Sequence, residues 1–343
     1  MREKIIFLGT DLHGKPSELA SKLVRDLSKE IEGAVKLSTQ NRKPLSGQKD
    51  AIVIPKIFEN NYLRKIVQGV MLPFYLLFLR LKYDTIFSFW VADKKYHCFL
   101  FNFLKFLRYE IIFTIISSCD KDYSCLKFCD VIICQSERMG KALNKIFPGK
   151  EIKIIPPWAD LKLFKPGKKE NSLLIPSVPY KVEDFEERGI NKMINVLKKN
   201  RIKTKIIFRS QESHRYFKKL DLKNVKLINK VLDDAELAKI MAGSKVIPLF
   251  YLANTPDVPL SAVEGLACGC SIICTDGMGL AEIIKKEKCG IVIQSRKNTE
   301  KEIIQAINKL LKNQSPNKRA RTTAEKYFDK KKNIKEYVKL IEE

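Results

Sequence analysis

The stretch Asp257-Val-Pro-Leu-Ser-Ala-Val-Glu264-Gly-Leu-Ala-Cys-Gly269-Cys-Ser-Ile-Ile-Cys-Thr275-Asp276-Gly277-Met-Gly279-Leu-Ala-Glu282 decides the fold of this chain. It predicts a loop, a helix that ends at Gly269, a short apolar strand over 271–274, and a second loop over 275–279 that starts another helix. The apolar run 245–250 predicts the strand before it. Two successive strands, each followed by a loop and a helix, indicate a parallel α/β sheet.

The edge of the sheet where these two loops meet is suited to an anionic ligand. Unpaired N–H groups at a helix start and the helix dipole both favour negative charge there. Open α/β sheets also bind their ligands outside the carboxyl ends of the strands. Glu264 would lie in the first turns of the first helix, where its carboxylate could reach a ribose hydroxyl beside such an anion.

This stretch resembles the nucleotide-sugar site of the retaining glycosyltransferases with the GT-B fold, a family 4-like group also known as glycosyl transferases group 1. The resemblance rests on Pro259-Leu260, Glu264-Gly-Leu-Ala-Cys-Gly269, the strand 271–274, Thr275-Asp276 and Leu280-Ala-Glu282. It implies that Glu264 binds the nucleotide ribose and that the segment before it, with Leu260 and Ser261, meets the diphosphate and the sugar. The family pattern has an earlier glutamate where Pro256 stands here. Asp257 is the nearest carboxylate and is our candidate for the sugar hydroxyls.

The resemblance also implies two cations that hold the leaving diphosphate. Pro176-Ser177 replaces the family's first pair, a glycine and an arginine, whereas Arg188-Gly189 matches the second pair with arginine in place of lysine. Arginine binds phosphate bidentately. We therefore expect Arg188 and Lys181 to stabilise the leaving group, with Arg209 as the other candidate for the missing cation. A solvated surface charge is the alternative for each.

The N-terminal part of the chain predicts a second unit of the same kind. A strand over 4–8, a loop with Gly9, His13 and Gly14, and a helix over 17–30 form an opening βα unit. The two glycines would let the backbone approach a ligand closely, although an ordinary tight turn fits as well. In the resembled family this loop lies in the interdomain cleft, which makes Gly9, His13 and Gly14 candidate substrate-binding residues.

Three prolines between Ile155 and Gly167 mark the crossing between the two units. Pro156, Pro157 and Pro166 interrupt regular structure, and the resembled family has a similar Ile-Pro, Asp and Phe-x-Pro spacing at its crossing. We therefore expect an acceptor-side Rossmann-like domain over 1–166 and a nucleotide-sugar-binding Rossmann-like domain over 167–325, facing each other across a cleft. A C-terminal helix over 326–343 would return to the first domain.

The net charge of +25 fits several partners: nucleic acid, an anionic membrane surface or acidic substrates. A solvated, lysine-rich surface fits as well. The lysines are spread along the whole chain and no nucleic-acid-binding motif is visible, so a nucleic-acid binder ranks last. The nine cysteines show no C-x-x-C spacing, and the chain starts directly in a strand. This predicts reduced core thiols in a cytoplasmic protein, with no metal site.

Two helical segments of the first domain bear on the membrane. The predicted helix 92–107 mixes aromatic with basic residues, which suits either a membrane headgroup layer or a core helix with snorkelling ends. The apolar run 70–79 is too short to span a bilayer. For this segment we favour a helix buried in the first domain over one that dips into a membrane.

The resemblance implies a metal-independent, retaining, hexosyltransferase-type glycosyltransferase that needs no cofactor. It would move a sugar from a nucleotide diphosphate sugar to a membrane-proximal, lipid-linked or glycan acceptor, at the cytoplasmic face of a membrane. The alternative is a catalytically weak or inactive relative that serves as a nucleotide-sugar-binding or partner module. The departures from the family pattern support that alternative, including Ser117-Ser118 where many members carry a histidine.

Overall fold

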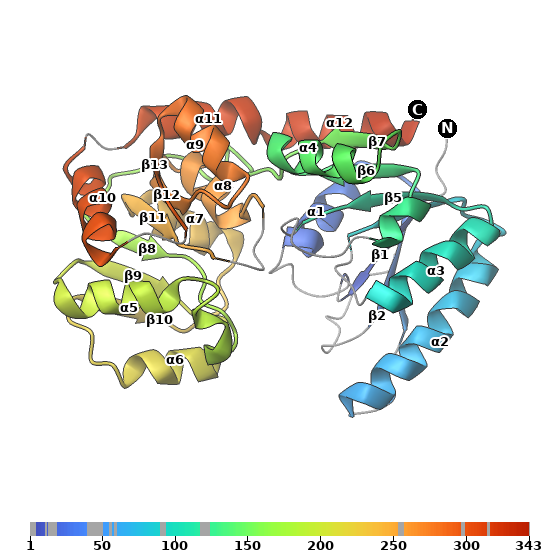
Figure 1. Ribbon diagram of the computed structural model, residues 1–343, viewed down its shortest axis with the longest axis horizontal. Coiled ribbons are helices and arrows are strands. Elements are labelled where there is room, and N and C mark those ends of the chain that lie inside the picture. The colour runs from blue at the N-terminus through green and yellow to red at the C-terminus, as the bar shows by residue number, and fades with distance from the viewer. Residues whose placement is uncertain are drawn as a thin grey trace. The chain divides into compact units, whose positions relative to one another are not determined.

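The computed structural model divides the chain into two compact units, Met1–Ile155 with Asn333–Glu343, and Pro156–Lys332 (Figure 1). Each unit is an α/β structure built on a parallel sheet. The residues that the structure describes are 5–10, 12, 19–39, 51–54, 57, 60–89, 94–116, 124–252, 257–295, 299–313 and 316–342.

The sheet of the first unit has seven parallel strands in the order β3-β2-β1-β4-β5-β6-β7. The strands are β1 (Ile5–Thr10), β2 (Val35–Thr39), β3 (Ala51–Ile54), β4 (Thr85–Ser88), β5 (Glu110–Thr114), β6 (Val131–Cys134) and β7 (Glu151–Ile154). The helices of this unit are α1 (Leu19–Leu27), α2 (Asn61–Leu79), α3 (Lys94–Phe106), the 3₁₀ turn η1 (Ser124–Phe128) and α4 (Glu137–Ile146). Central strands such as β4 and β6 are buried throughout, because helices cover both faces of a parallel sheet.

The sheet of the second unit has six parallel strands in the order β10-β9-β8-β11-β12-β13. The strands are β8 (Leu173–Ile175), β9 (Thr204–Ile207), β10 (Val225–Ile228), β11 (Val246–Leu249), β12 (Ser271–Thr275) and β13 (Gly290–Ile293). The helical elements are η2 (Val182–Phe185), α5 (Ile190–Lys199), α6 (Gln211–Lys218), α7 (Asp234–Ala242), α8 (Leu260–Ala267), α9 (Leu280–Glu287), α10 (Glu300–Lys312), α11 (Lys318–Tyr327) and the start of α12 (Lys330–Glu342).

Alternate side chains of the second sheet pack into two separate cores. Leu174 and Ile247 point to the core that α7, α8, α9 and α11 share. Leu173 and Val246 point to the opposite core, formed with α5 and α10. Successive side chains of a strand face opposite sides of a sheet, so one short apolar strand serves both cores. This explains why the strands of this unit read as continuous apolar runs.

The two units meet in the sequence at Ile155–Pro156, earlier than the boundary expected between 166 and 167. The intervening residues pack with the second unit because Phe164 is buried in its core and Ala159 donates a backbone hydrogen bond of 2.9 Å to Phe328. Near the C-terminus, Asn333–Glu343 belongs to the first unit. There the ring of Tyr337 lies 5.7 Å from that of Phe87.

Helix α2 is buried on one side only, which corrects the expectation of a buried helix for the run 70–79. Leu72 and Leu76 are fully buried against the sheet, whereas Phe74 and Phe78 on the other side are 59% and 72% exposed. The segment is apolar all round, and its sequence pattern therefore does not distinguish its inner from its outer side. Among the helices that the structure describes, none is long and apolar enough to cross a membrane.

We predict that Tyr337→Ala destabilises the first unit by about 3–4 kcal/mol, because it removes a fully buried ring from the contact with Phe87. Urea-induced unfolding of the whole chain, followed by circular dichroism, measures this change. Lys335→Ala, at an exposed position of the same helix, is the matched control. Equal unfolding curves for the two variants would contradict the packing of α12 against the first sheet.

Candidate functional site

The candidate site lies at the carboxyl edge of the second sheet, where β8 and β11 are neighbours. Val246 of β11 pairs with Leu173 of β8, and the strand order reverses between these two strands. The connection after β8 leads to α5 on one face of the sheet, while the connection after β11 leads to α8 on the other. Open α/β sheets bind ligands at such a switch point, because the two connections leave a crevice between them.

Gly189 joins the start of α5 closely to the end of β11. It has a φ of 64°, and a Cβ at this position would lie 2.1 Å from the carbonyl oxygen of Phe250. The backbone N–H of Leu252 donates to the carbonyl of Glu187 over 2.8 Å, which ties the same two segments together. Only glycine suits both the left-handed backbone and this close approach. The predicted Arg188-Gly189 pair is therefore held against the end of β11.

The charges of two predicted cations, Arg188 and Arg209, act at the side chain of Tyr251. The guanidinium carbon of Arg188 lies 5.0 Å from the centre of the Tyr251 ring. Burial raises the pKa of the Tyr251 hydroxyl, and the charges of Arg188 and Arg209 oppose that rise. The phenol thus stays protonated at neutral pH, with both guanidiniums near it. The hydroxyl of Thr275 also donates to the Tyr251 carbonyl over 2.6 Å, which connects this residue to the loop after β12.

Sequence reasoning missed Tyr251. The available signal was its place directly after an apolar strand that ends at the predicted ligand edge, between two loops already selected. An aromatic residue in that place reads equally well as part of the core. Its contact with Arg188 depends on the pairing of β8 with β11, which the sequence pattern does not reveal.

Lys181 and Arg209 lie on neighbouring segments after β8 and β9, and both are exposed. The segment after β8 is fastened to the start of α6, because the hydroxyl of Ser210 donates to the Tyr180 carbonyl over 2.6 Å. Ser213 likewise donates to the Pro179 carbonyl over 2.5 Å. Lys181 is the N-cap residue of η2. Of the two candidates for the missing cation, Arg209 is the one whose charge lowers the pKa of the Tyr251 hydroxyl.

Glu264 is buried in α8, with a side chain only 3% exposed. The next residue, Gly265, lets α8 approach the sheet, since a Cβ there would lie 2.3 Å from Ile247. Leu260 and Ser261 form the first turn of this helix and are half-buried. The structure therefore places Glu264, Leu260 and Ser261 on a single helix that starts at the switch point.

The helices that start at the switch point have no side-chain cap in the part of the chain that the structure describes. The N-cap residues are Gly189 for α5 and Pro259 for α8. Side chains cap α4, α6, α7, α10 and α11 from Ser136, Ser210, Asp233, Thr299 and Asn317, whereas α9, whose N-cap is Gly279, has no side-chain cap either. A helix start without a side-chain cap suits an anion, which the helix dipole also favours.

Asp257 connects the loop before α8 with the start of α9. One oxygen of its buried carboxylate accepts a hydrogen bond of 2.9 Å from the Gly279 N–H, and its carbonyl accepts from Leu280 over 3.2 Å. This residue therefore positions the loop after β12. Its expected contact with sugar hydroxyls stays a prediction.

The candidates in the first unit are only partly described. Gly9 is in β1, and a Cβ there would lie 3.1 Å from the side chain of Leu12. The Leu12 N–H donates to the Ser38 hydroxyl over 2.9 Å. The space beside Gly9 is thus taken by a neighbouring residue of its own loop. His13 and Gly14 lie outside the described residues, so their expected role stays a prediction.

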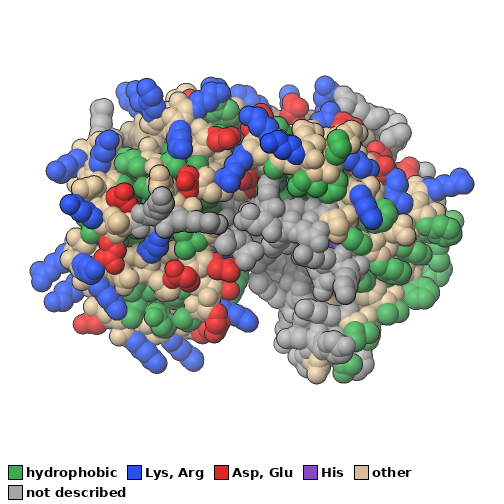
Figure 2. Space-filling view, viewed as in Figure 1, with side chains coloured by type: hydrophobic (Ala, Val, Ile, Leu, Met, Phe, Trp, Pro, Cys, Tyr) green, Lys and Arg blue, Asp and Glu red, His purple; other side chains and the backbone are tan. Residues whose placement is uncertain are grey.

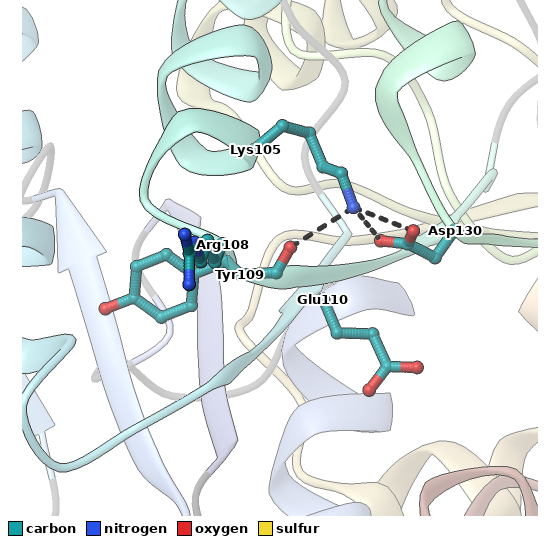
Figure 3. Close-up of a pocket in the computed structure, with 5 residues that line it drawn as sticks. All are labelled: Lys105, Arg108, Tyr109, Glu110 and Asp130. Carbon is teal, nitrogen blue, oxygen red and sulfur yellow. Dashed lines mark hydrogen bonds and ion pairs between the residues drawn. The ribbon is translucent and has the colours of Figure 1, made fainter.

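A hollow of about 460 Å³ lies at the amino-terminal edge of the first sheet, where β5 begins (Figure 3). It is lined by Lys105, Arg108, Tyr109, Glu110 and Asp130. The ammonium of Lys105 lies 2.8 and 2.9 Å from the two Asp130 oxygens. Asp130 also accepts from the Ile111 N–H over 2.8 Å. These charges stabilise the connection between α3 and β5.

In the described part of the chain, no three His, Cys, Asp or Glu side chains gather as metal ligands would.

The second unit matches a known family in sequence. Residues 164–327 match the family model described as glycosyl transferases group 1. This segment is therefore similar in sequence to that family. It contains the whole candidate site of the second unit, from Lys181 to Gly279, whereas the first unit lies outside the match. A search of curated protein sequences found no significant match.

Solved structures of glycosyltransferases resemble the chain over nearly its whole length. Sucrose-phosphate synthase from Thermosynechococcus elongatus is 15% identical with a TM-score of 0.73, and 98% of each chain is covered. Anabaena HepE in complex with UDP and glucose is 14% identical with a TM-score of 0.72, covering 98% of this chain and 99% of that one. WaaG, a glycosyltransferase involved in lipopolysaccharide biosynthesis, is 14% identical with a TM-score of 0.69 over the same shares. These likenesses show that the chain has the GT-B fold of two Rossmann-like domains.

We predict that Gly189→Ala destabilises the second unit by at least about 2 kcal/mol, because it places a Cβ against the Phe250 carbonyl in a left-handed backbone. Thermal unfolding measures the loss. Gly277→Ala is the matched control, since a Cβ at Gly277 meets open space and changes stability by less than about 0.5 kcal/mol. Equal melting temperatures for the two variants would show that α5 does not start as described.

Proposed function

We propose that this chain is a retaining, hexosyltransferase-type glycosyltransferase that uses a nucleotide diphosphate sugar and needs no metal ion. The observation that carries the proposal is the contact of Arg188 with Tyr251 at the start of α5, where the charge of Arg209 also acts on the Tyr251 hydroxyl. Guanidinium groups and helix starts without a side-chain cap at a strand switch point are suited to a diphosphate. Family and fold support the same class of reaction.

In the proposed reaction, the bond between the sugar and the diphosphate breaks and the acceptor oxygen takes the sugar. Negative charge then grows on the leaving diphosphate. Arg188 and Arg209 stabilise that charge in place of a metal ion, together with the helix N–H groups, and groups fixed in advance do this most effectively. Glu264 binds the ribose from α8. Asp257 holds the loop after β12 in place and is the proposed partner of the sugar hydroxyls.

The comparisons support a choice of donor and acceptor class. HepE was solved with UDP, with UDP and glucose, and with UDP-glucose, which makes UDP-sugars the first donors to test. WaaG takes part in lipopolysaccharide biosynthesis, which supports a lipid-linked or glycan acceptor. We propose that the acceptor lies at the cytoplasmic face of an anionic membrane.

We predict that the protein releases UDP or GDP from a nucleotide sugar, and that Arg188→Ala lowers the rate by roughly 100-fold or more, as removal of a leaving-group cation does. Glu264→Ala is expected to abolish turnover as well, since it removes the ribose contact. A coupled assay of nucleotide release measures both, with and without polyprenyl-phosphate or glycolipid acceptors. Arg201→Ala, at an exposed arginine near the amino end of β9, is the control and retains full activity.

The assay also separates the alternatives. Nucleotide binding without turnover on any donor would favour the inactive, nucleotide-sugar-binding module. The absence of both, together with salt-sensitive RNA binding, would replace the proposal by a nucleic-acid binder.

A separate prediction distinguishes the two candidates for the second cation. Arg209→Ala weakens UDP binding by about tenfold or more, because its charge acts at the Tyr251 hydroxyl as that of Arg188 does. Lys181→Ala changes the affinity by less than about twofold, because the charges that lower the pKa of this hydroxyl are those of Arg188 and Arg209 and not that of Lys181. Isothermal titration with UDP measures both affinities. The reverse order would assign the second cation to Lys181.

A further inference from the structure

Helices α2 and α3 carry an apolar surface on the outside of the first unit. We define this α2–α3 face by its most exposed large side chains: Val70, Phe74, Phe78, Leu81, Phe99 and Phe106. Figure 2 shows hydrophobic side chains gathered in the region where Figure 1 draws these two helices. Large apolar patches on a protein surface usually mark a site of interaction.

The exposure of this face does not come from loosely packed helices. Leu81, Phe106 and Phe78 are 91%, 82% and 72% exposed. On the inner sides of the same helices, Leu76 and Leu104 are fully buried in the core of the unit. Each helix is therefore anchored to the sheet and apolar on both sides, a pattern that a water-exposed helix does not need.

The two helices form one continuous face because they run side by side in the same direction. The Tyr96 hydroxyl, at the start of α3, donates to the Gly69 carbonyl of α2 over 2.9 Å. At the other end, the Arg80 Nε donates to the Leu107 carbonyl over 2.7 Å. Both bonds join residues 27 positions apart, so the helices stay in register. The stretch from Val70 to Leu81 covers about three turns, or roughly 17 Å.

Basic residues flank this face. The sequences of α2 and α3 contain no Asp or Glu, and the ammonium of Lys105 in α3 pairs with Asp130 outside these helices. Next to the most exposed apolar side chains, Lys82 and Arg108 are exposed as well. Two copies of this face, placed against each other, would oppose cations with cations. An anionic lipid surface, by contrast, attracts the basic residues and accepts the apolar side chains below its headgroups.

We propose that the α2–α3 face docks onto the surface of an anionic lipid bilayer, with Phe78, Leu81 and Phe106 entering the headgroup layer. The helices lie on the membrane and do not cross it. The proposal goes beyond the chemistry of the donor site, because it rests on the first unit alone and holds whichever sugar is transferred.

Co-sedimentation of the full chain with vesicles tests this proposal. Vesicles of phosphatidylcholine with one quarter phosphatidylglycerol bind the protein, and binding falls about tenfold or more on pure phosphatidylcholine or at 0.5 M salt. The double variant Leu81→Ser/Phe106→Ser loses at least about tenfold in affinity for the mixed vesicles. The control Ile146→Ser/Leu163→Ser changes exposed apolar residues outside the face and binds as the wild type does.

Charge reversal gives an independent measurement. Lys82→Glu/Arg108→Glu weakens binding to the mixed vesicles by about tenfold or more and leaves binding to neutral vesicles unchanged. All these positions are exposed, so each variant keeps its circular dichroism spectrum and its UDP binding. If the donor site is assigned wrongly, only the measurement of UDP binding will disagree with expectation. If the docking proposal is wrong, only the vesicle sedimentation will.

Two results would overturn the proposal. The first is a wild type that does not bind the mixed vesicles, or a Leu81→Ser/Phe106→Ser variant that binds them equally well. The second is a lipid-free dimer in sedimentation velocity that this variant converts to monomer, which would assign the face to a second copy of the chain.

Discussion

The close approach of Gly189 to the carbonyl of Phe250 is the constraint on which the candidate site depends. A side chain at position 189 would collide with the backbone at the end of β11. Without this contact, α5 could not begin where the two central loops of the sheet meet. Arg188 precedes this glycine directly, so the geometry that requires glycine also places a guanidinium over Tyr251. Gly189 thus couples the packing of the backbone to the position of the Arg188 guanidinium, the group proposed to bind the ligand.

The pattern of side-chain caps at the helix N-termini supports the same location for the candidate site. Side chains cap several of the other helices, and the capping box of α7, with Asp233 and Glu236, is one example, although α9 has no side-chain cap. At the switch point, Gly189 and Pro259 leave the first N–H groups of α5 and α8 without a side-chain cap. Capping contributes about 1 kcal/mol to a helix. Its absence at the two helix starts beside Arg188 is consistent with an anion that takes the place of the cap.

The first unit differs from the second in the outer surface of two of its helices. Its sheet is built like the second, but α2 and α3 are apolar on both sides. The inner sides supply the core, through Leu72, Leu76 and Leu104. On the outer sides, Phe74, Phe78 and Phe106 are exposed. A basic rim and an apolar face on the same pair of helices join the two forces that hold a protein on a membrane surface.

The sequence by itself determined the fold class. It also determined the positions of those candidate site residues whose place follows from their neighbours along one helix or loop. Apolar runs of strand length, each followed by a loop and a helix, predict parallel sheets, and the strands expected over 4–8 and 271–274 are found as Ile5–Thr10 and Ser271–Thr275. Glu264 and the Arg188-Gly189 pair could be placed because their neighbours along the chain define their positions. The tertiary structure alone decided which distant residues meet. Arg188 contacts Tyr251, and Asp257 bonds to Gly279, through strand order and loop packing, which local patterns do not encode. It also decided which side of α2 is exposed, because a segment that is apolar all round gives no sign of the side that a sheet will cover.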